Sequence, residues 1–404
     1  MPGTEKTPKK PTTKSTDIED YLARLPSPPQ EHVHELNMER RLKRLIEEEL
    51  SFEELRFYSR QIMLDEVGLE GQLKLKNRKV CIVGLGGLGS TIATQLTTMG
   101  VGHLRLVDRD VVEESNLQRQ HLYNFDVIGY PKVEAAVKRL EKLNPYVTFE
   151  PLPLSLNERN VDNILSSMDV IVDGLDNMNA RYAINRASVR LGMPYVFGSA
   201  ISSFGNASTI IPGETACLEC FYGGLDDHLL PSCGTLGVHP SVIGVVASVE
   251  VAETVKILLE KPPNLRNKLL YCDVGSMRFE EIEVAQAENC LVCGDQPQIN
   301  PAPLKQVLVE EGCGRNKRRV FTAVPREDLK LKLEKLIRFL KREGARLKVQ
   351  GQHGVTFATK DGILASVLKS GIMIIEGMNS EEEALSFYQR IIVEKMGTPR
   401  SCIE

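Results

Sequence analysis

The sequence predicts an α/β fold with a doubly wound parallel sheet. Between Val80 and about Ser199, short apolar runs alternate with helical patterns, as happens where crossover helices join parallel strands. The apolar runs predict strands that end near Val83, Val107 and Asp173. The patterns between them predict helices near 90–99, 131–143 and 178–191. Such sheets bind ligands at the carboxyl ends of their strands, so a site is expected among the residues that come after these runs.

A glycine-rich turn follows the strand that ends at Val83. Its glycines are Gly84, Gly86, Gly87 and Gly89. Without side chains, they let the backbone approach phosphates, and the next helix points its N-terminal N–H groups at them. Asp108 lies 22 residues beyond Gly86, where a carboxylate can accept hydrogen bonds from ribose hydroxyls. The setting predicts a Rossmann-like nucleotide site, with a purely structural turn as the alternative. A nicotinamide or flavin oxidoreductase is the first candidate.

Composition and charge narrow the class of protein. At 404 residues the chain can hold two domains with buried cores. Its 42% hydrophobic and 26% charged residues are typical of a soluble globular protein, and a net charge of −4 gives no reason to expect a nucleic-acid partner. No apolar stretch resembles a signal peptide or approaches the ~18 residues of a membrane span. A cytoplasmic protein without membrane contact is therefore expected.

The large domain is expected over residues 31–293, after a disordered tail. Residues 1–30 are rich in Lys, Pro, Thr and Ser and cannot form a core. A charged amphipathic helix is predicted over 33–50, and Ser51 with Glu54 predicts a capping box that opens the next helix. From about 195 to 285 the pattern becomes β-rich, apart from a long helix predicted over 241–260.

A linker and a small α+β domain are expected after the large domain. Residues 294–317 contain three prolines and several glycines, which predicts the linker. Residues 318–404 predict the small domain. A helical stripe is formed by Leu329, Leu333, Leu336 and Leu340, three short apolar runs come next, and Ser380 with Glu383 predicts a second capping box.

Two Cys-x-x-Cys pairs predict a metal site. The pairs are Cys217 with Cys220 and Cys290 with Cys293, separated by 69 residues. Four thiolates form a closed, tetrahedral structural zinc site. The separation is longer than in compact zinc ribbons, so unpaired thiols or a redox Cys-x-x-Cys remain alternatives. The total of nine cysteines is odd, which in a reducing compartment favours metal ligation and free thiols over disulfides. Cys81 and Cys272 are expected in the core.

Polar residues around the glycine turn predict a triphosphate site. Arg60, Arg119 and Lys132 offer three cations, and Asp176 follows the strand that ends near Asp173. Cations neutralise phosphate charge and a carboxylate can hold Mg²⁺, which favours a nucleoside triphosphate over a dinucleotide. Taken singly, each base would more often be a solvated surface charge.

The ordered combination closely resembles the adenylation domain of ubiquitin-activating enzymes. It also resembles their bacterial relatives that adenylate sulfur-carrier proteins in molybdopterin and thiamine synthesis. The resemblance covers roughly residues 50–293. The resemblance implies ATP, Mg²⁺ and Zn²⁺ as cofactors and adenylation of the C-terminal glycine of a ubiquitin-like protein. It assigns the ribose to Asp108, the triphosphate to Asn116 and Arg119, the phosphates to Lys132 and Mg²⁺ to Asp176. In homodimeric members, an arginine like Arg60 reaches the nucleotide from the opposite subunit.

Cys233 is the predicted nucleophile. It stands in a Gly- and Pro-rich segment outside both cysteine pairs, and a partly buried cysteine without function is the alternative. The segment resembles the region that holds the nucleophilic cysteine of thioester-forming family members. A thiolate there would attack the adenylate.

The sequence leaves several functions open. The first is homodimeric, ATP-dependent activation of a ubiquitin-like protein ending in Gly-Gly, with a thioester on Cys233 and transfer to a conjugating enzyme. The alternatives are adenylation of a sulfur-carrier protein for sulfur transfer, a nucleotide-binding oxidoreductase and a non-catalytic nucleotide-sensing module. By its position, the domain at 318–404 is similar to the ubiquitin-fold domain that recruits conjugating enzymes. Because it offers no nucleotide-binding or nucleophilic cluster, its removal is expected to leave adenylation and thioester formation nearly intact.

Overall fold

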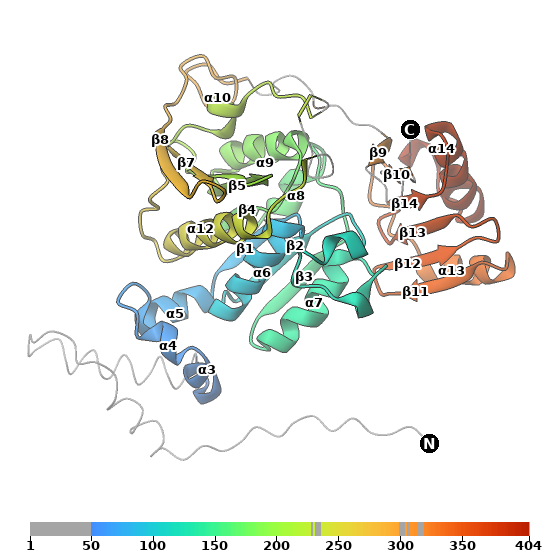
Figure 1. The fold of residues 1–404 in the computed structure, drawn as a ribbon, viewed down its shortest axis with the longest axis horizontal. Coiled ribbons are helices and arrows are strands. Elements are labelled where there is room, and N and C mark those ends of the chain that lie inside the picture. Colours follow the sequence, from blue (N-terminus) through green and yellow to red (C-terminus); the bar gives the residue numbers. More distant parts are fainter. Residues whose placement is uncertain are drawn as a thin grey trace, which may run out of the picture. The chain divides into compact units, whose positions relative to one another are not determined.

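The computed structural model describes residues 50–227, 229–230, 236–298, 304, 308–312 and 319–403 (Figure 1). The predicted tail at 1–30 and the predicted helix at 33–50, except for its last residue, lie outside this part of the chain. The chain divides after Leu75 into two compact units.

The described part of the first unit is helical. It contains α3 (Phe52–Phe57), α4 (Ser59–Ile62) and α5 (Gly68–Lys76), the last of which continues one residue into the second unit. The predicted capping box is confirmed. The Ser51 hydroxyl accepts the Glu54 N–H at 3.2 Å, and the Glu54 carboxylate accepts the Ser51 N–H at 2.9 Å.

An eight-stranded sheet forms the centre of the second unit (Figure 1). Its strands are β1 (Lys79–Val83), β2 (His103–Val107), β3 (Thr148–Leu152), β4 (Val170–Asp173), β5 (Tyr195–Ile201), β6 (Phe204–Ile210), β7 (Lys268–Asp273) and β8 (Arg278–Glu283). Their order is β3-β2-β1-β4-β5-β6-β7-β8. Neighbouring strands from β3 to β5 are parallel, and those from β5 to β8 are antiparallel. The predicted strand ends and the doubly wound parallel sheet are confirmed.

Helices cover both faces of this sheet (Figure 1). One face carries α6 (Gly87–Met99), α7 (Lys132–Leu143) and α12 (Pro240–Leu258), and the other carries α8 (Val161–Leu165), α9 (Met178–Leu191) and α10 (Leu218–Tyr222). Short 3₁₀ turns occur at Glu114–Asn116 and Phe125–Val127. The helices predicted near 90–99, 131–143, 178–191 and 241–260 are confirmed, although α6 begins earlier than expected because Gly86 is its N-cap. No helix in the described chain is both long and apolar enough to cross a membrane.

The C-terminal part of the second unit has its own antiparallel sheet. Its strands are β9 (Val309–Gly312), β10 (Val320–Ala323), β11 (Arg346–Gln350), β12 (Gly354–Ala358), β13 (Leu364–Leu368) and β14 (Met373–Glu376), in the order β11-β12-β13-β14-β10-β9. One face packs against α13 (Leu333–Arg342), α14 (Glu381–Gln389) and the π-helical turn Arg390–Lys395, and together they form one apolar core. A 3₁₀ turn follows at Arg400–Cys402. We call residues 308–403 the small domain.

Three expectations for the small domain need correction. Strand β9 lies inside the predicted linker at 294–317, because pairing with β10, and not its own short sequence, makes it a strand. Helix α13 begins at Leu333, since the Leu329 N–H donates to the Ser370 carbonyl and Lys330 has a left-handed φ of +47°. The predicted second capping box is only half formed: Ser380 caps Glu383, whose carboxylate accepts the N–H of Asn379 instead.

Candidate nucleotide site and cysteine cluster

The glycine turn lies where the strand order reverses. Strand β1 is flanked by β2 and β4, so the crevice between the ends of β1 and β4 is the switch point at which such sheets bind ligands. Gly84 has a φ of +88°, and a Cβ there would lie 2.5 Å from the Gly174 carbonyl oxygen. A Cβ on Gly89 would lie 1.8 Å from the Gly84 carbonyl oxygen. Both positions therefore require glycine, as expected for a turn that closes tightly under a phosphate.

A compact acid–base cluster borders this turn. The buried Asp108 carboxylate accepts the N–H groups of Leu85 and Asp110, both at 2.7 Å. The Lys132 ammonium lies 2.9 Å from the Asp110 carboxylate, and only 7% of the Lys132 side chain is exposed. Asp108 follows β2 and Lys132 begins α7, so the two ends of this connecting segment are brought together as the sequence predicts. Asp110 is the partner that sequence reasoning missed, although it stands two residues after Asp108.

The charged groups of this cluster shift one another's pKa values. Burial alone would lower the pKa of Lys132, but Asp110 and Asp108 outweigh it, so that pKa lies above its ordinary value. Burial raises the pKa of Asp108 despite Lys132. Burial alone would raise the pKa of Asp110, but the positive charges of Lys132 and Arg109 outweigh this effect and lower that pKa below its ordinary value. The result is a fixed ammonium held beside the glycine turn, a group suited to phosphate oxygens.

Asp176 lies in the electrostatic field of the same cluster. It comes after β4, is exposed, and contributes to the raised pKa of Lys132, although Asp110 and Asp108 contribute more. It also contributes to the raised pKa of Arg109, after Glu310 and Asp110. The exposed Asp176 carboxylate thus acts electrostatically on Lys132 and Arg109, and a carboxylate is an oxygen ligand of the kind that Mg²⁺ prefers.

The loop after Asp110 covers the glycine turn. The Tyr123 hydroxyl donates to the Leu85 carbonyl at 3.0 Å, and a Cβ on Gly86 would lie 3.9 Å from the Gln120 side-chain nitrogen. Gln120 is buried, yet its Oε1 has no hydrogen-bond partner within the described chain. A buried acceptor without a donor beside a glycine turn fits a ligand that supplies one.

Asn116 and Arg119 lie on the same covering loop. Asn116 is buried, and its side-chain oxygen accepts the Glu113 N–H at 3.2 Å. Arg119 is half-buried and donates to the Ser115 carbonyl at 2.8 Å. Both belong to the segment that closes over the turn, and their predicted contacts with the triphosphate stay predictions.

A buried ion pair that sequence reasoning also missed supports the loop that carries Asp176. Arg181 on α9 donates to Asp173 at 3.0 Å, to the Leu175 carbonyl at 2.7 Å and to the Gly198 carbonyl at 2.8 Å. The Tyr195 hydroxyl donates to the same carboxylate at 2.6 Å. Burial alone would lower the pKa of Arg181, but the Asp173 carboxylate outweighs this effect and raises that pKa above its ordinary value. The guanidinium therefore stays charged. The sequence signal for this pair is Asp173, an acidic residue that ends the apolar strand Val170–Val172.

Two predicted site residues are not placed at this site. Cys233 lies outside the described residues. Arg60 lies exposed on α4 in the first compact unit. The nucleophile and the contribution from a second subunit therefore stay predictions.

The four predicted zinc ligands converge. The Sγ atoms of Cys217, Cys220, Cys290 and Cys293 all lie within 4.8 Å of one another. Sγ–Sγ distances of 3.9 Å, 3.7 Å and 3.4 Å join 217 to 220, 217 to 290 and 220 to 293. Tetrahedral zinc with Zn–S bonds of ~2.3 Å needs sulfurs about 3.8 Å apart. The cluster therefore fits a structural zinc ion and joins two distant chain segments.

The surroundings of the cluster suit thiolates. The buried Asn185 amide donates to Cys217 Sγ at 3.5 Å, and the Ala287 N–H donates to Cys220 Sγ at 3.5 Å. Such N–H donors orient and stabilise metal-bound sulfur. Outside the cluster, burial raises the pKa of Cys81 to about 12 and also raises that of Cys272, and both thiols lie in the core as expected.

Replacement of one ligand should release the metal. We expect Cys290→Ser to reduce bound zinc from one ion per chain to near zero and to lower the thermal midpoint, because the metal joins segments that the sheet alone does not connect. Cys402→Ser, outside the cluster, is the control and should keep its zinc. Metal analysis and thermal unfolding measure both. A fully folded wild-type chain without zinc would contradict the assignment.

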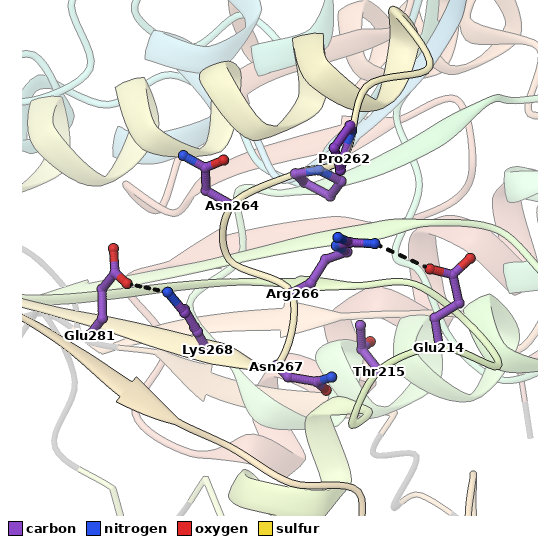
Figure 2. A pocket seen from close by; sticks show the side chains of 9 residues that line it. Glu214, Thr215, Pro262, Asn264, Arg266, Asn267, Lys268 and Glu281 are labelled. Atoms are coloured by element: carbon purple, nitrogen blue, oxygen red, sulfur yellow. Dashed lines mark hydrogen bonds and ion pairs between the residues drawn. The ribbon is translucent and has the colours of Figure 1, made fainter.

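A separate surface cavity of about 510 Å³ has no part in this site (Figure 2). Figure 2 shows its two bases paired: Arg266 lies 3.6 Å from Glu214 and Lys268 lies 2.6 Å from Glu281. None of the predicted nucleotide residues lines it. With its cations already neutralised, it lacks the free positive charge that a phosphate ligand needs.

Comparisons with known proteins agree with this geometry. The model of the ThiF family matches residues 58–292, more than half of the chain. The sulfur carrier protein ThiS adenylyltransferase of Bacillus subtilis is 31% identical over 341 residues, which cover 83% of this chain and 98% of that protein. The sulfur carrier protein adenylyltransferase of Thermus thermophilus is 39% identical and covers 61% of this chain and 93% of its own. The SAMP-activating enzyme E1 of Haloferax volcanii is 38% identical, over 59% of this chain and 88% of that protein.

Solved structures give the same result for the fold. The crystal structure of E. coli MccB with ATP matches with a TM-score of 0.53 and 26% identity, over 68% of this chain and 85% of that one. The sheet order, the glycine turn at its switch point and the four-cysteine cluster occur together in a chain that the family model covers over most of its large domain. This protein belongs to the ThiF family, within the E1-like adenylating enzymes.

Proposed function

We propose that this protein uses ATP to adenylate the C-terminal carboxylate of a small sulfur-carrier protein of the ubiquitin-like type. The observation that carries the proposal is the buried Lys132 ammonium, which pairs with Asp110 beside Asp108 and the glycine turn. It provides a fixed cation where the backbone can approach phosphates. The names of the B. subtilis and T. thermophilus relatives support a sulfur carrier as the acceptor.

The proposed reaction needs positioning and charge neutralisation only. An oxygen of the carrier's terminal carboxylate attacks the α-phosphorus of ATP, and the bond from that phosphorus to the bridging oxygen breaks. Pyrophosphate leaves with the bonding electrons and the carrier becomes an acyl-adenylate. In this step Lys132 and Arg119 would neutralise the phosphates, the Asn116 amide would donate a hydrogen bond to them, and Asp108 would hold the ribose. Asp176 would hold Mg²⁺, which supplies further neutralisation of the polyphosphate.

The adenylated carrier has two competing end uses, and the sequence alone favours conjugation. A thioester on Cys233 with transfer to a conjugating enzyme still rests on sequence resemblance, whereas the names of the relatives favour sulfur transfer. Both uses share the adenylation step, so only the chemistry after adenylation separates them. The oxidoreductase alternative has no support among these relatives.

The experiment is ATP–pyrophosphate exchange with a sulfur-carrier protein that ends in Gly-Gly. We expect exchange that depends on the carrier, is lost in Asp176→Ala and persists in Cys233→Ala, since the thiol is not needed for adenylation. A carrier adduct that is sensitive to reducing agent and vanishes in Cys233→Ala would restore the thioester hypothesis. Absence of exchange with any Gly-Gly carrier, in a chain that binds Mg–ATP, would contradict the proposal.

The same assay tests the proposed homodimer. If Arg60 completes the partner's site, mixed dimers of Arg60→Ala and Asp176→Ala chains should regain activity, because one of their two sites has both groups intact. No recovery after verified subunit exchange would remove Arg60 from the partner's site.

A further inference from the structure

The residues that hold Lys132 form a short antiparallel ribbon. The Lys132 N–H donates to the Asp110 carbonyl at 2.9 Å, and the N–H groups of Val112 and Gly129 donate to the carbonyls of Tyr130 and Val112, both at 2.8 Å. Val111 pairs with Pro131 between these bonds. We call residues 110–112 with 129–132 the phosphate ribbon.

The two faces of the phosphate ribbon have different roles. Side chains alternate along extended backbone, so Asp110 and Lys132 share one face and Val111 and Pro131 share the other. The first face carries the ion pair of the nucleotide site. The second face is covered by the small domain: Val111 packs with Leu368, and a Cβ on Gly354 would lie 2.8 Å from Pro131.

Strand β12 has the matching alternation. Val355 and Phe357 point into the small domain's helix-covered core, so Thr356 between them points to the opposite sheet face. Its hydroxyl donates to the Gly129 carbonyl at 2.6 Å, and it also lies 2.8 Å from the Ser366 hydroxyl. Thr356 is buried, which makes its hydroxyl a dry, directional contact with the phosphate ribbon.

Two polar contacts extend this interface on either side. The His353 N–H donates to the Glu134 carboxylate at 3.0 Å, two residues after Lys132 on α7. At the other end, Glu310 on β9 lies 2.7 Å from the Arg109 guanidinium. Glu310 raises the pKa of Arg109 against the opposing effect of burial. The small domain thus contacts residues on both sides of the Asp110–Lys132 pair.

We propose that the small domain positions the nucleotide site, with Thr356 as the positioning residue that holds the phosphate ribbon through Gly129. The proposal rests on the proposed function, because it assigns ATP to the cluster around Lys132. It reverses the sequence-based expectation that removal of the domain leaves adenylation nearly intact, since removal would expose Val111 and free the ribbon's outer face.

The test is Mg–ATP binding to the full chain without any carrier. Thr356→Val removes the hydroxyl and leaves the Gly129 carbonyl without its donor, and we expect a Kd for Mg–ATP about tenfold higher. Thr356→Ser keeps the hydroxyl and should bind within twofold of the wild type. Tyr388→Phe is the matched control: it removes a buried hydroxyl that donates to the Gly371 carbonyl at 3.1 Å inside the small domain, away from the ribbon. It should also bind within twofold.

A second variant changes an exposed small-domain residue, Glu310, that pairs with Arg109 next to the phosphate ribbon. Glu310 has 41% of its side chain exposed, so Glu310→Lys should fold and place a cation opposite Arg109. We expect Mg–ATP binding at least threefold weaker at high salt, where the long-range attraction of the added cation for the nucleotide is screened, and this variant carries the test if Thr356→Val does not fold. Wild-type binding by both variants, or equal loss in Tyr388→Phe, would overturn the positioning role. No Mg–ATP binding by the wild type would instead remove the proposed function, and this inference with it.

Discussion

Lys132→Ala is expected to lower the rate of ATP–pyrophosphate exchange about 10²–10³-fold, which corresponds to about 2.7–4 kcal/mol of transition-state stabilisation. The ammonium is held in place by Asp110 and is largely shielded from water, so its charge acts on the phosphates with little screening. Its removal also leaves Asp108 and Asp110 without their cation. Exchange kinetics with a saturating carrier measure the effect.

The control for this prediction lies on the same helix. Lys138 is 48% exposed and pairs with Glu134 one turn away, so Lys138→Ala should exchange at close to the wild-type rate. A pH series adds a second measurement. Lys132 lowers the pKa of Asp110 in the folded protein, and the resulting stability is present above the ordinary carboxyl pKa and lost as the pH falls through the folded value. The stability difference between the wild type and Lys132→Ala should therefore shrink in acid. A Lys132→Ala protein with wild-type exchange would remove Lys132 from the site.

Arg181→Met is expected to destabilise the protein by about 3–5 kcal/mol, because it leaves the fully buried Asp173 without its cation. It also removes the donors to the Leu175 and Gly198 carbonyls, which join the turn before Asp176 to β5. Denaturant unfolding measures the stability. Exchange should fall as well, since the Asp176 turn loses its support.

Arg190→Met provides the comparison for Arg181. Arg190 lies on the same helix, and its partner Asp162 is 48% exposed, so loss of this pair should cost no more than about 1 kcal/mol. Similar losses in the two variants would show that burial does not set the strength of the Arg181 pair. The contrast is therefore a direct test of the buried ion pair.

The sequence alone predicted the elements whose signals are local. The ends of β1, β2 and β4 are marked by apolar runs of strand length, and the glycine turn with α6 is encoded by residues adjacent in the chain. The capping box at Ser51 is a pattern of four neighbouring residues. The four cysteines were predictable as a cluster because Cys-x-x-Cys pairs carry their chemistry in their spacing, whatever the fold between them.

Only the tertiary structure decided which of the polar residues act together. Lys132 meets Asp110 because the segment between β2 and α7 folds back on itself, and Arg181 meets Asp173 because α9 carries its guanidinium back to the end of β4. Thr356 reaches Gly129 across 227 residues of sequence, a contact that no local pattern encodes. Strand β9 shows the same limit, since its pairing with β10 creates it. Periodicity predicts which face of an element is apolar, whereas the partner of that face depends on how the sheets pack. The contact between the small domain and residues 129–131 was for this reason not predicted.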